Sequence, residues 1–166
     1  MSNSGINQLA VDQFSSAERQ RFMDRNPKTV ALAEQAKQSL YGGVPMHWMS
    51  DWSTPVPLFV SHAKDARFYD VDGHEYIDFC LGDTGTMFGH SPDPIAAALA
   101  RQGNRGLTTM LPGEDAIACG ELLSARFGLP YWQVTTTATD ANRFVVRWAR
   151  AVTERSVLLV FDGCYH

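Results

Sequence analysis

The sequence predicts an α/β protein with a mostly parallel sheet, and three consecutive segments carry this prediction. Residues 131–137 have the pattern of a strand, and residues 157–161 form an unbroken apolar run, as expected of a parallel strand covered on both faces. Between them, apolar residues recur at spacings of three and four along a helix that runs to about Thr153. Together the segments make a βαβ unit with a right-handed crossover. The apolar residues of this helix are Ala141, Phe144, Val145, Trp148, Ala149 and Val152.

The chain begins with two predicted helices. Residues 1–30 are polar and carry both signs of charge, so they form either a helical arm or a solvated tail. A second helix is predicted over residues 27–40, because the pair Gly42-Gly43 supplies the glycine signal that commonly follows a helix.

A β-hairpin is the clearest local prediction. Alternating apolar residues on both sides of Asp72-Gly73 predict strands over residues 66–71 and 74–79, joined by a two-residue turn of the primed type. We expect this hairpin to carry structure and no chemistry. Residues 80–91 follow as a loop, and its glycines allow backbone conformations closed to other residues, as a loop that lines a site often requires.

Two further helices are predicted before the βαβ unit. Ser91-Pro92 provides a cap residue and a first-turn proline for a helix that runs to Gly103. The next helix covers residues 114–127 and is stopped by Gly128.

The turn Ala138-Thr139-Asp140, where the last helix starts, is the predicted functional site. In a βαβ unit, this helix start and the end of the second strand open on one edge of the sheet, so we expect Thr139 and Tyr165 to be neighbours. The first N–H groups of a helix lack partners inside it, and the helix dipole adds positive charge, so a phosphate fits there. Alternatively, Thr139 is only an N-cap residue, with Asp140 placed favourably at the positive end.

The stretch from Val134 to Asn142, Val-Thr-Thr-Thr-Ala-Thr-Asp-Ala-Asn, resembles a segment of the class III, pyridoxal-phosphate-dependent aminotransferases. The similarity covers residues 30–166 and is closest to the branch of glutamate-1-semialdehyde aminomutase and β-amino-acid aminotransferases. It implies the fold type I architecture of that family. The other matching segments are Leu58-Phe59-Val60, Ala63-Lys64, residues 70–79, Gly89-His90 and Tyr165-His166.

The resemblance implies pyridoxal 5'-phosphate as the cofactor. The phosphate contacts of the family match Ala138 and Thr139, and its ring-stacking aromatic residue matches Tyr165, which could otherwise be a core residue at a strand end. His166 is assigned to lining the same site. Thr137, Ala138 and Asp140 stand where the family has Ser, Gly and Glu. Alanine suits the turn unless a positive φ is needed, and Asp140, assigned to the substrate pocket, is one methylene shorter than glutamate.

Residues 45–52 also depart from the family. After Gly42-Gly43-Val44, the related branch commonly has Asn-Ser and then an arginine that can hold a substrate carboxylate. This chain has no arginine in residues 26–66, and instead places Trp48, Trp52 and two methionines there, which make an apolar, adaptable surface. We expect Trp48 and Trp52 to accept a bulky apolar group of the substrate. The alternative is a contact between subunits.

Composition predicts a soluble, cytoplasmic globular protein. The chain is 45% hydrophobic and 19% charged, with a net charge of −4, which argues against binding to nucleic acid. No apolar run approaches the ~20 residues of a membrane span, and the polar N-terminus is unlike a signal peptide. Three separated cysteines suit free thiols in a reducing compartment, and no cluster of residues suggests a metal site.

The organisation of the chain predicts part of a longer protein. We expect residues 1–90 to belong to a small domain and residues 91–166 to begin the large, cofactor-binding domain. A single βαβ unit would leave both sheet edges open, so the isolated chain should not fold stably. By resemblance, the Schiff-base lysine lies downstream of His166, and residues 104–112 match a segment that crosses a dimer interface. A homodimer with shared active sites is implied. The chain's own lysines are Lys28, Lys37 and Lys64.

The implied activity is the transfer of an amino group from an amino acid or amine donor to a keto acid acceptor. Two alternatives stay open. The first is an aminomutase or amino-acid epimerase of the same fold. The second is a non-catalytic α/β binding domain in which Thr139 is an ordinary cap.

Overall fold

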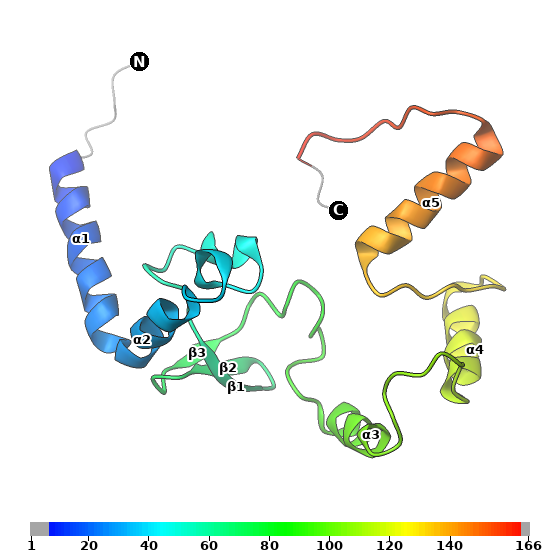
Figure 1. Cartoon of the computed structure of the whole chain (residues 1–166), viewed down its shortest axis with the longest axis horizontal. Coiled ribbons are helices and arrows are strands. Elements are labelled where there is room, and N and C mark those ends of the chain that lie inside the picture. The colour runs from blue at the N-terminus through cyan, green and yellow to red at the C-terminus, as the bar shows by residue number, and fades with distance from the viewer. Residues whose placement is uncertain (1–6, 164–166) are drawn as a thin grey trace. The chain divides into compact units, whose positions relative to one another are not determined.

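A computed structural model describes residues 7–163, and it divides into two compact units (Figure 1). The boundary between them follows Leu107: unit 1 belongs to residues 1–107 and unit 2 to residues 108–166. Unit 1 holds the sheet and most of the tertiary hydrogen bonds, whereas unit 2 consists of two helices and connecting segments. The predicted division of the complete protein into domains at residue 90 stays a prediction.

Two helices open unit 1. Helix α1 spans Gln8–Arg25 and begins at Asn7, whose side chain accepts a hydrogen bond from the amide of Ala10 at 3.2 Å. Of the two predictions for this region, the helical arm is therefore confirmed. Helix α2 spans Pro27–Ala36 and starts with a proline, as helices often do.

The predicted end of α2 near residue 40 is wrong by four residues. The chain leaves the helix after Ala36, and Leu40 is already extended at φ −117° and ψ 130°. The pair Gly42-Gly43 instead belongs to a short 3₁₀ turn, η1 (Tyr41–Gly43), in which both glycines have positive φ. A Cβ on Gly43 would stand 3.2 Å from the Lys37 side chain, so the glycine lets the chain fold back against α2.

A three-stranded antiparallel sheet follows a second 3₁₀ turn, η2 (His47–Ser50). Its strands are β1 (Val60–Lys64), β2 (Arg67–Asp70) and β3 (Glu75–Ile77), in the order β1-β2-β3. Strands β2 and β3 form the predicted hairpin, and β1 adds a strand on the other side of β2.

The predicted two-residue turn of this hairpin is wrong, because the loop has three residues. The amide of Asp70 donates to the carbonyl of His74, and Gly73 N–H donates to the Asp70 carbonyl. Only Gly73 in the loop has a positive φ, of 94°, whereas a primed two-residue turn would require one at Asp72 also. The observed pattern is that of a turn closed by a glycine bulge.

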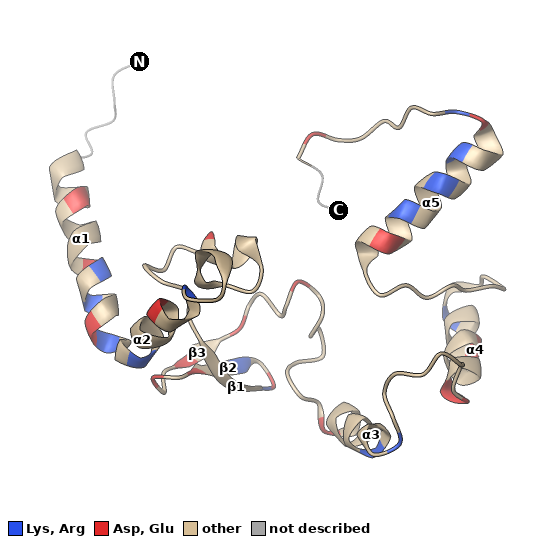
Figure 2. Ribbon diagram, in the orientation of Figure 1, with Lys and Arg blue, Asp and Glu red and all other residues tan. Residues whose placement is uncertain are grey.

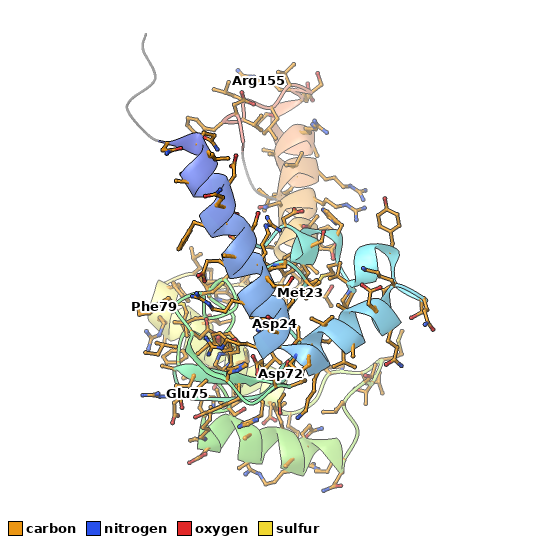
Figure 3. The ribbon with its side chains drawn as sticks, turned by 90° about the vertical axis from the view of Figure 1, so that its left-hand side faces the viewer. Met23, Asp24, Asp72, Glu75, Phe79 and Arg155 are labelled. Atoms are coloured by element: carbon orange, nitrogen blue, oxygen red, sulfur yellow. The ribbon has the colours of Figure 1, made fainter. Side chains whose placement is uncertain are left out.

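The hairpin loop caps α2. The Asp72 carboxylate accepts hydrogen bonds from the backbone amides of Lys28 at 2.8 Å and Thr29 at 2.9 Å. Asp72 is labelled in Figure 3. These amides belong to the first turn of α2, where a negative charge also meets the positive end of the helix dipole. Asp72 thereby joins two elements more than forty residues apart in sequence.

Helix α3 (Asp93–Gly103) ends unit 1. Pro92 is its cap residue and no side chain caps it, so the predicted capping by Ser91 is wrong; Ser91 has a φ of 48° and points its carbonyl to Lys64 Nζ at 2.7 Å. Lys64 also pairs with Asp93 at 2.5 Å, which ties β1 to the start of α3.

Unit 2 contains helices α4 (Asp115–Phe127) and α5 (Ala138–Thr153). Helix α4 begins within one residue of its predicted start and ends at Gly128, which adopts the left-handed conformation with a φ of 71°. Helix α5 ends at the predicted residue, Thr153, and Glu154 follows with a φ of 57°.

The two strands predicted around α5 are absent from the described chain. Residues 131–137 and 157–161 pair with no neighbouring strand, and the side chains of Val134, Val157 and Leu159 are 84–97% exposed. A buried parallel strand is stabilised by hydrogen bonds to neighbouring strands and by residues that cover its two faces. Within residues 7–163, these two segments have neither. The expected βαβ unit is therefore not formed here, although the apolar helix between the segments is.

Burial is concentrated in unit 1, around α2 and the hairpin. The buried apolar residues are Ala33 and Val44, and the buried polar residues are Asn26, Thr29 and Asp70. Among the described residues, no helix combines the length and the apolar character that crossing a membrane requires.

Candidate functional site

The start of α5 is built by a threonine cap. Thr137 is the N-cap residue, with extended backbone angles, and its Oγ1 accepts a hydrogen bond from the Asp140 amide at 3.1 Å. Ala138 and Thr139 are therefore the first two residues of the helix. The alternative in which Thr139 is the N-cap residue is wrong, because the cap lies two residues earlier.

The backbone at Ala138 and Thr139 suits an anion. Both residues lie in the first turn of α5, whose N–H groups point out of the helix end and share its positive partial charge. Ala138 does not have a positive φ, so alanine in place of the family's glycine introduces no backbone strain. Its single methyl group also leaves room for a ligand to approach. The local structure thus fits a phosphate group, and the assignment of Ala138 and Thr139 to the cofactor stays a prediction.

Asp140 turns back onto the cap. One carboxylate oxygen accepts from the Thr137 hydroxyl at 3.1 Å and the Thr136 hydroxyl at 3.4 Å, while the other lies 3.3 Å from the Arg143 guanidinium. The arrangement resembles a capping box, in which the third helical residue and the cap residue bind each other. Asp140 therefore stabilises the start of the helix, and its predicted place in a substrate pocket is not tested.

Helix α5 has a basic face. Figure 2 shows Lys and Arg positions in blue at intervals along the ribbon of α5. A shallow groove of about 300 Å³ is lined by three of its arginines. The opposite face carries the predicted apolar residues, of which Phe144 is 59% and Trp148 74% exposed. The lining of the basic groove comprises Thr139, Asn142, Arg143, Val146, Arg147 and Arg150.

Unit 1 contains a second candidate site, which we call the tryptophan groove. It has a volume of about 620 Å³ and is lined by residues from the segment 43–60 together with Phe68. Trp48 and Trp52 both lie in its wall, with their ring centroids 6.5 Å apart and their planes at 80°. The structure thus brings the two predicted substrate residues together, but their role stays a prediction.

A polar network in the hairpin was not anticipated. The buried Asp70 carboxylate accepts from the His74 amide at 2.8 Å and from the Tyr76 hydroxyl at 2.9 Å, and it lies 2.9 Å from His74 Nδ1. Burial raises the pKa of Asp70, but the bonds from His74 and Tyr76 outweigh this and hold the pKa below its ordinary value. Burial and the bond to Asp70 raise the pKa of Tyr76 to about 12. The network fixes the hairpin, in keeping with a structural role.

A second network closes the loop of residues 79–89, here called the 79–89 loop. Asp78 accepts from the amides of Cys80 at 2.8 Å and Leu81 at 2.9 Å, and its other oxygen lies 2.6 Å from His90 Nε2. The backbones of His90 and Asp65 exchange two hydrogen bonds at 2.7 and 3.0 Å. The Asp78–His90 spacing could have been noticed in the sequence, but only the fold places the two side chains together.

Five of the predicted site residues are described by the structure, and they fall into two sets. Ala138, Thr139 and Asp140 adjoin one another in unit 2, whereas Trp48 and Trp52 share a groove in unit 1. Tyr165 and His166 lie outside the described residues, so the expected proximity of Tyr165 and Thr139 stays a prediction. Within residues 7–163, no three metal-ligating side chains gather in one place.

Comparisons with known proteins identify the family. The family model described as "Aminotransferase class-III" matches residues 48–166. The glutamate-1-semialdehyde 2,1-aminomutase of Methanocaldococcus jannaschii is 34% identical over 142 residues, which cover 84% of this chain and 32% of that protein. These matches confirm the resemblance drawn from the motifs.

Solved structures agree in fold. A glutamate-1-semialdehyde-aminomutase from Pseudomonas aeruginosa PAO1, in complex with PMP, the amino form of pyridoxal phosphate, superposes with a TM-score of 0.85 at 45% identity. The superposition covers 92% of this chain and 34% of the aminomutase chain. A β-phenylalanine aminotransferase from Variovorax paradoxus gives a TM-score of 0.79 at 25% identity, over 87% of this chain and 34% of that one. The predicted fold type I class is thus confirmed, and so is pyridoxal phosphate as the cofactor of the family.

This chain spans about a third of the length of the curated relatives that it matches. The match nevertheless extends over well over half of its own residues. It includes the start of α5 and the part of the tryptophan groove that lies from Trp48 onward. On this evidence the chain belongs to the class III aminotransferase family.

Proposed function

We propose that this chain is part of a pyridoxal-phosphate-dependent enzyme that transfers an amino group between an amino acid or amine and a keto acid. The observation that carries the proposal is the start of α5, where Ala138 and Thr139 lie in a capped first turn suited to a phosphate. Membership of the class III aminotransferase family supports an enzyme over a non-catalytic binding domain. The longer protein to which the chain is proposed to belong is called the complete enzyme below.

In this proposal, the residues of α5 hold and orient the cofactor. The first-turn amides and the Thr139 hydroxyl bind its phosphate, while Thr137 and Asp140 keep the helix end in shape through their mutual hydrogen bonds. Tyr165 covers the ring of the cofactor and His166 lines the same site. The bound cofactor supplies the electron sink that stabilises a carbanion at the carbon bearing the amino group.

The lysine that holds the cofactor and moves the proton is proposed to lie outside residues 1–166. All three lysines of the chain belong to unit 1. Lys37 pairs with Glu34 at 2.6 Å, and Lys64 pairs with Asp93 and with the Ser91 carbonyl. These contacts give both lysines structural roles. A homodimer and a cytoplasmic location are likewise part of the proposal.

The test is cofactor uptake and amino transfer by the complete enzyme. We expect the purified protein to absorb in the region of bound pyridoxal phosphate, to lose this band when an amine donor is added, and to regain it with a keto acid. Mass spectrometry should then find the new amino acid. A colourless complete protein that takes up no added cofactor would contradict the proposal.

An aminomutase is the second candidate, and the names of relatives favour it. Several relatives that are 32–34% identical are glutamate-1-semialdehyde 2,1-aminomutases. A mutase converts one substrate to its isomer without a separate keto acid. The substrate in those names keeps the side-chain carboxylate of glutamate. No cationic side chain that could bind such a carboxylate lines the tryptophan groove. Product analysis with a single substrate therefore distinguishes the two candidates.

A further inference from the structure

Unit 1 contains a further pocket between α1 and the hairpin, which we call the α1–hairpin pocket. It has a volume of about 700 Å³, within the range of roughly 300–1,000 Å³ in which proteins bind small organic ligands. One side is formed by α1, and the other by β3 and the end of the loop before it. Residues 53–55 complete the lining.

Both sides of this pocket are attached to helix α2. Asn26, which joins α1 to α2, is 4% exposed, and its Nδ2 donates to the Phe22 carbonyl at 2.7 Å. On the other side, Asp72 binds the first amides of α2, and the Tyr76 hydroxyl donates to the buried Asp70 at 2.9 Å. The pocket is therefore formed before a ligand binds, which lowers the entropic cost of binding.

Both carboxylates of the lining already have partners. Glu18 pairs with Arg21 at 2.6 Å. Glu75 pairs with Arg67, a residue outside the lining, and accepts a hydrogen bond from the Tyr69 hydroxyl at 2.5 Å. A cation brought into the pocket would therefore meet no carboxylate that is free of a basic neighbour.

Two arginines of the lining, Arg19 and Arg25, form no ion pair within residues 7–163. Burial and the bond to Asp70 dominate the pKa of Tyr76, and the charge of Arg25 acts against them, so the guanidinium lies within electrostatic range of that hydroxyl. A guanidinium can bind a carboxylate through two parallel hydrogen bonds. The unpaired charges of the pocket therefore suit an anion.

Apolar side chains of α1 lie beside these arginines. Val11, Phe14 and Phe22 recur at spacings that place them on the same helix face as Arg25. Phe14 is 68% exposed, so a ring placed against it would remove apolar surface from water. The lining thus combines a basic part with an aromatic part.

We propose that the α1–hairpin pocket binds a small organic carboxylate that carries an aromatic or other apolar body. Arg25 binds the carboxylate, Arg19 adds positive charge, and the apolar body lies against Phe14 and Phe22. Such a ligand joins α1 to the hairpin and restrains both. The proposal does not depend on the amino transfer proposed above.

The test titrates the complete enzyme with three probes. The first, 1-naphthaleneacetate, has both the carboxylate and the rings; 1-naphthaleneacetamide has the same rings without the charge, and acetate has the charge without the rings. Calorimetry measures each dissociation constant. We expect 1-naphthaleneacetate to bind at least roughly ten-fold more tightly than either of the others, because only this probe uses both parts of the pocket.

Hydrogen exchange of the complete enzyme locates the bound probe. With 1-naphthaleneacetate present, the amides of residues 8–25 and 74–77 should exchange more slowly, since the ligand restrains α1 and the hairpin. The same concentration of 1-naphthaleneacetamide should have little effect.

Three variants assign the binding to this pocket. Arg25→Gln removes the charge and should weaken the binding of 1-naphthaleneacetate by roughly ten-fold, with the amide unaffected. Ser15→Trp fills the pocket from α1 without changing a charge, so it should abolish the binding of both naphthyl compounds. Arg101→Gln is the matched control, because it removes an arginine of α3 that does not line the pocket, and it should change neither affinity.

Four outcomes would overturn the proposal. Equal affinity of wild type and Arg25→Gln for 1-naphthaleneacetate, or slower exchange confined to other residues, would mean that the probe binds elsewhere. Equal affinity for the acid and its amide would mean that the arginines do not hold the ligand, and equal affinity for acetate would exclude the apolar part. Failure of the wild type to bind the probe would mean that another part of the complete enzyme covers the pocket.

Discussion

Few side chains decide the chemistry proposed for the start of α5. The Thr137 hydroxyl already accepts from the Asp140 amide and donates to the Asp140 carboxylate, so it serves the cap. The proposed phosphate contact is assigned to Thr139, the next threonine and the second residue of the helix. One hydroxyl therefore shapes the helix end and another is proposed to bind the ligand.

Replacing Thr139 with valine tests this assignment. Valine keeps the shape of the side chain but cannot donate a hydrogen bond to a phosphate oxygen. Loss of a charge-assisted bond should cost about 1.5–3 kcal/mol, which weakens cofactor binding by roughly ten- to a hundred-fold. The dissociation constant is measured by titrating the apo form of the complete enzyme with pyridoxal phosphate.

Thr153→Val is the matched control at the other end of α5. The Thr153 hydroxyl donates to the Ala149 carbonyl at 2.8 Å, so its loss should leave the cofactor affinity unchanged. Equal affinities of wild type and Thr139→Val would place the phosphate elsewhere.

The 79–89 loop is an element whose shape depends on its base. A Cβ on Gly89 would stand 3.0 Å from the Asp65 carbonyl oxygen, so only glycine permits the close approach of the two backbones. Asp78 then binds both the start of the loop, through Leu81, and its end, through His90. The loop exposes large apolar side chains, and Phe79 and Phe88 are about nine-tenths exposed. Its conformation is therefore determined by polar contacts at the base.

Asp78→Asn should loosen this loop. The asparagine oxygen can still accept the two backbone bonds, but the side chain loses its charge, and an NH₂ group replaces the oxygen that lies against His90 Nε2. We expect the complete enzyme to lose about 1–3 kcal/mol of stability at neutral pH, seen as a lower midpoint of thermal unfolding. Asp83→Asn, at an exposed carboxylate in the same loop, should have almost no effect.

The stability lost in Asp78→Asn should depend on pH. Hydrogen bonds from the Leu81 amide and from His90 lower the pKa of Asp78 in the folded protein. A carboxyl with a lowered pKa contributes stability above its ordinary pKa, near about 4, and loses it as the pH falls through the folded value. The difference between wild type and Asp78→Asn should therefore shrink in acid. A constant difference down to pH values below about 3 would contradict the assignment.

The two units differ in how much they bury. Unit 1 contains the sheet, the cap of α2 by Asp72 and all the buried residues of the described chain, whereas neither α4 nor α5 has a buried residue. A helix without tertiary cover is marginal in water, because most of its stability comes from packing of its apolar face. The tertiary contacts that stabilise the described chain are thus concentrated around the hairpin.

Hydrogen exchange of the 166-residue chain should reveal this difference. We expect the amides of β2 and α2 to exchange more slowly than those of α4 and α5, since local opening of an uncovered helix requires little free energy. Mass spectrometry of peptides after timed exchange measures it. Protection of α5 equal to that of β2 would show that unit 2 is stabilised as strongly as unit 1.

Local patterns predicted the elements that local contacts stabilise. Gly128 ends α4 because a left-handed residue is needed there, and the spacing of apolar residues placed the end of α5 at Thr153. The hairpin was placed correctly but its loop was not, because a loop of two or three residues depends on which amides pair across the strands. Residues 131–137 have a strand pattern, but a strand also needs a neighbour.

By itself, the sequence determined the helices, the hairpin, the family motifs and the threonine-rich start of α5, since these depend on residues that are close along the chain. Only the tertiary structure decided that Asp72 caps a helix more than forty residues away, that Asp78 meets His90, and that Phe68 joins the tryptophans in one groove. The reason is physical: hydrogen bonds and apolar contacts between distant residues form only after the chain has folded back, and no local pattern specifies which partners will then meet.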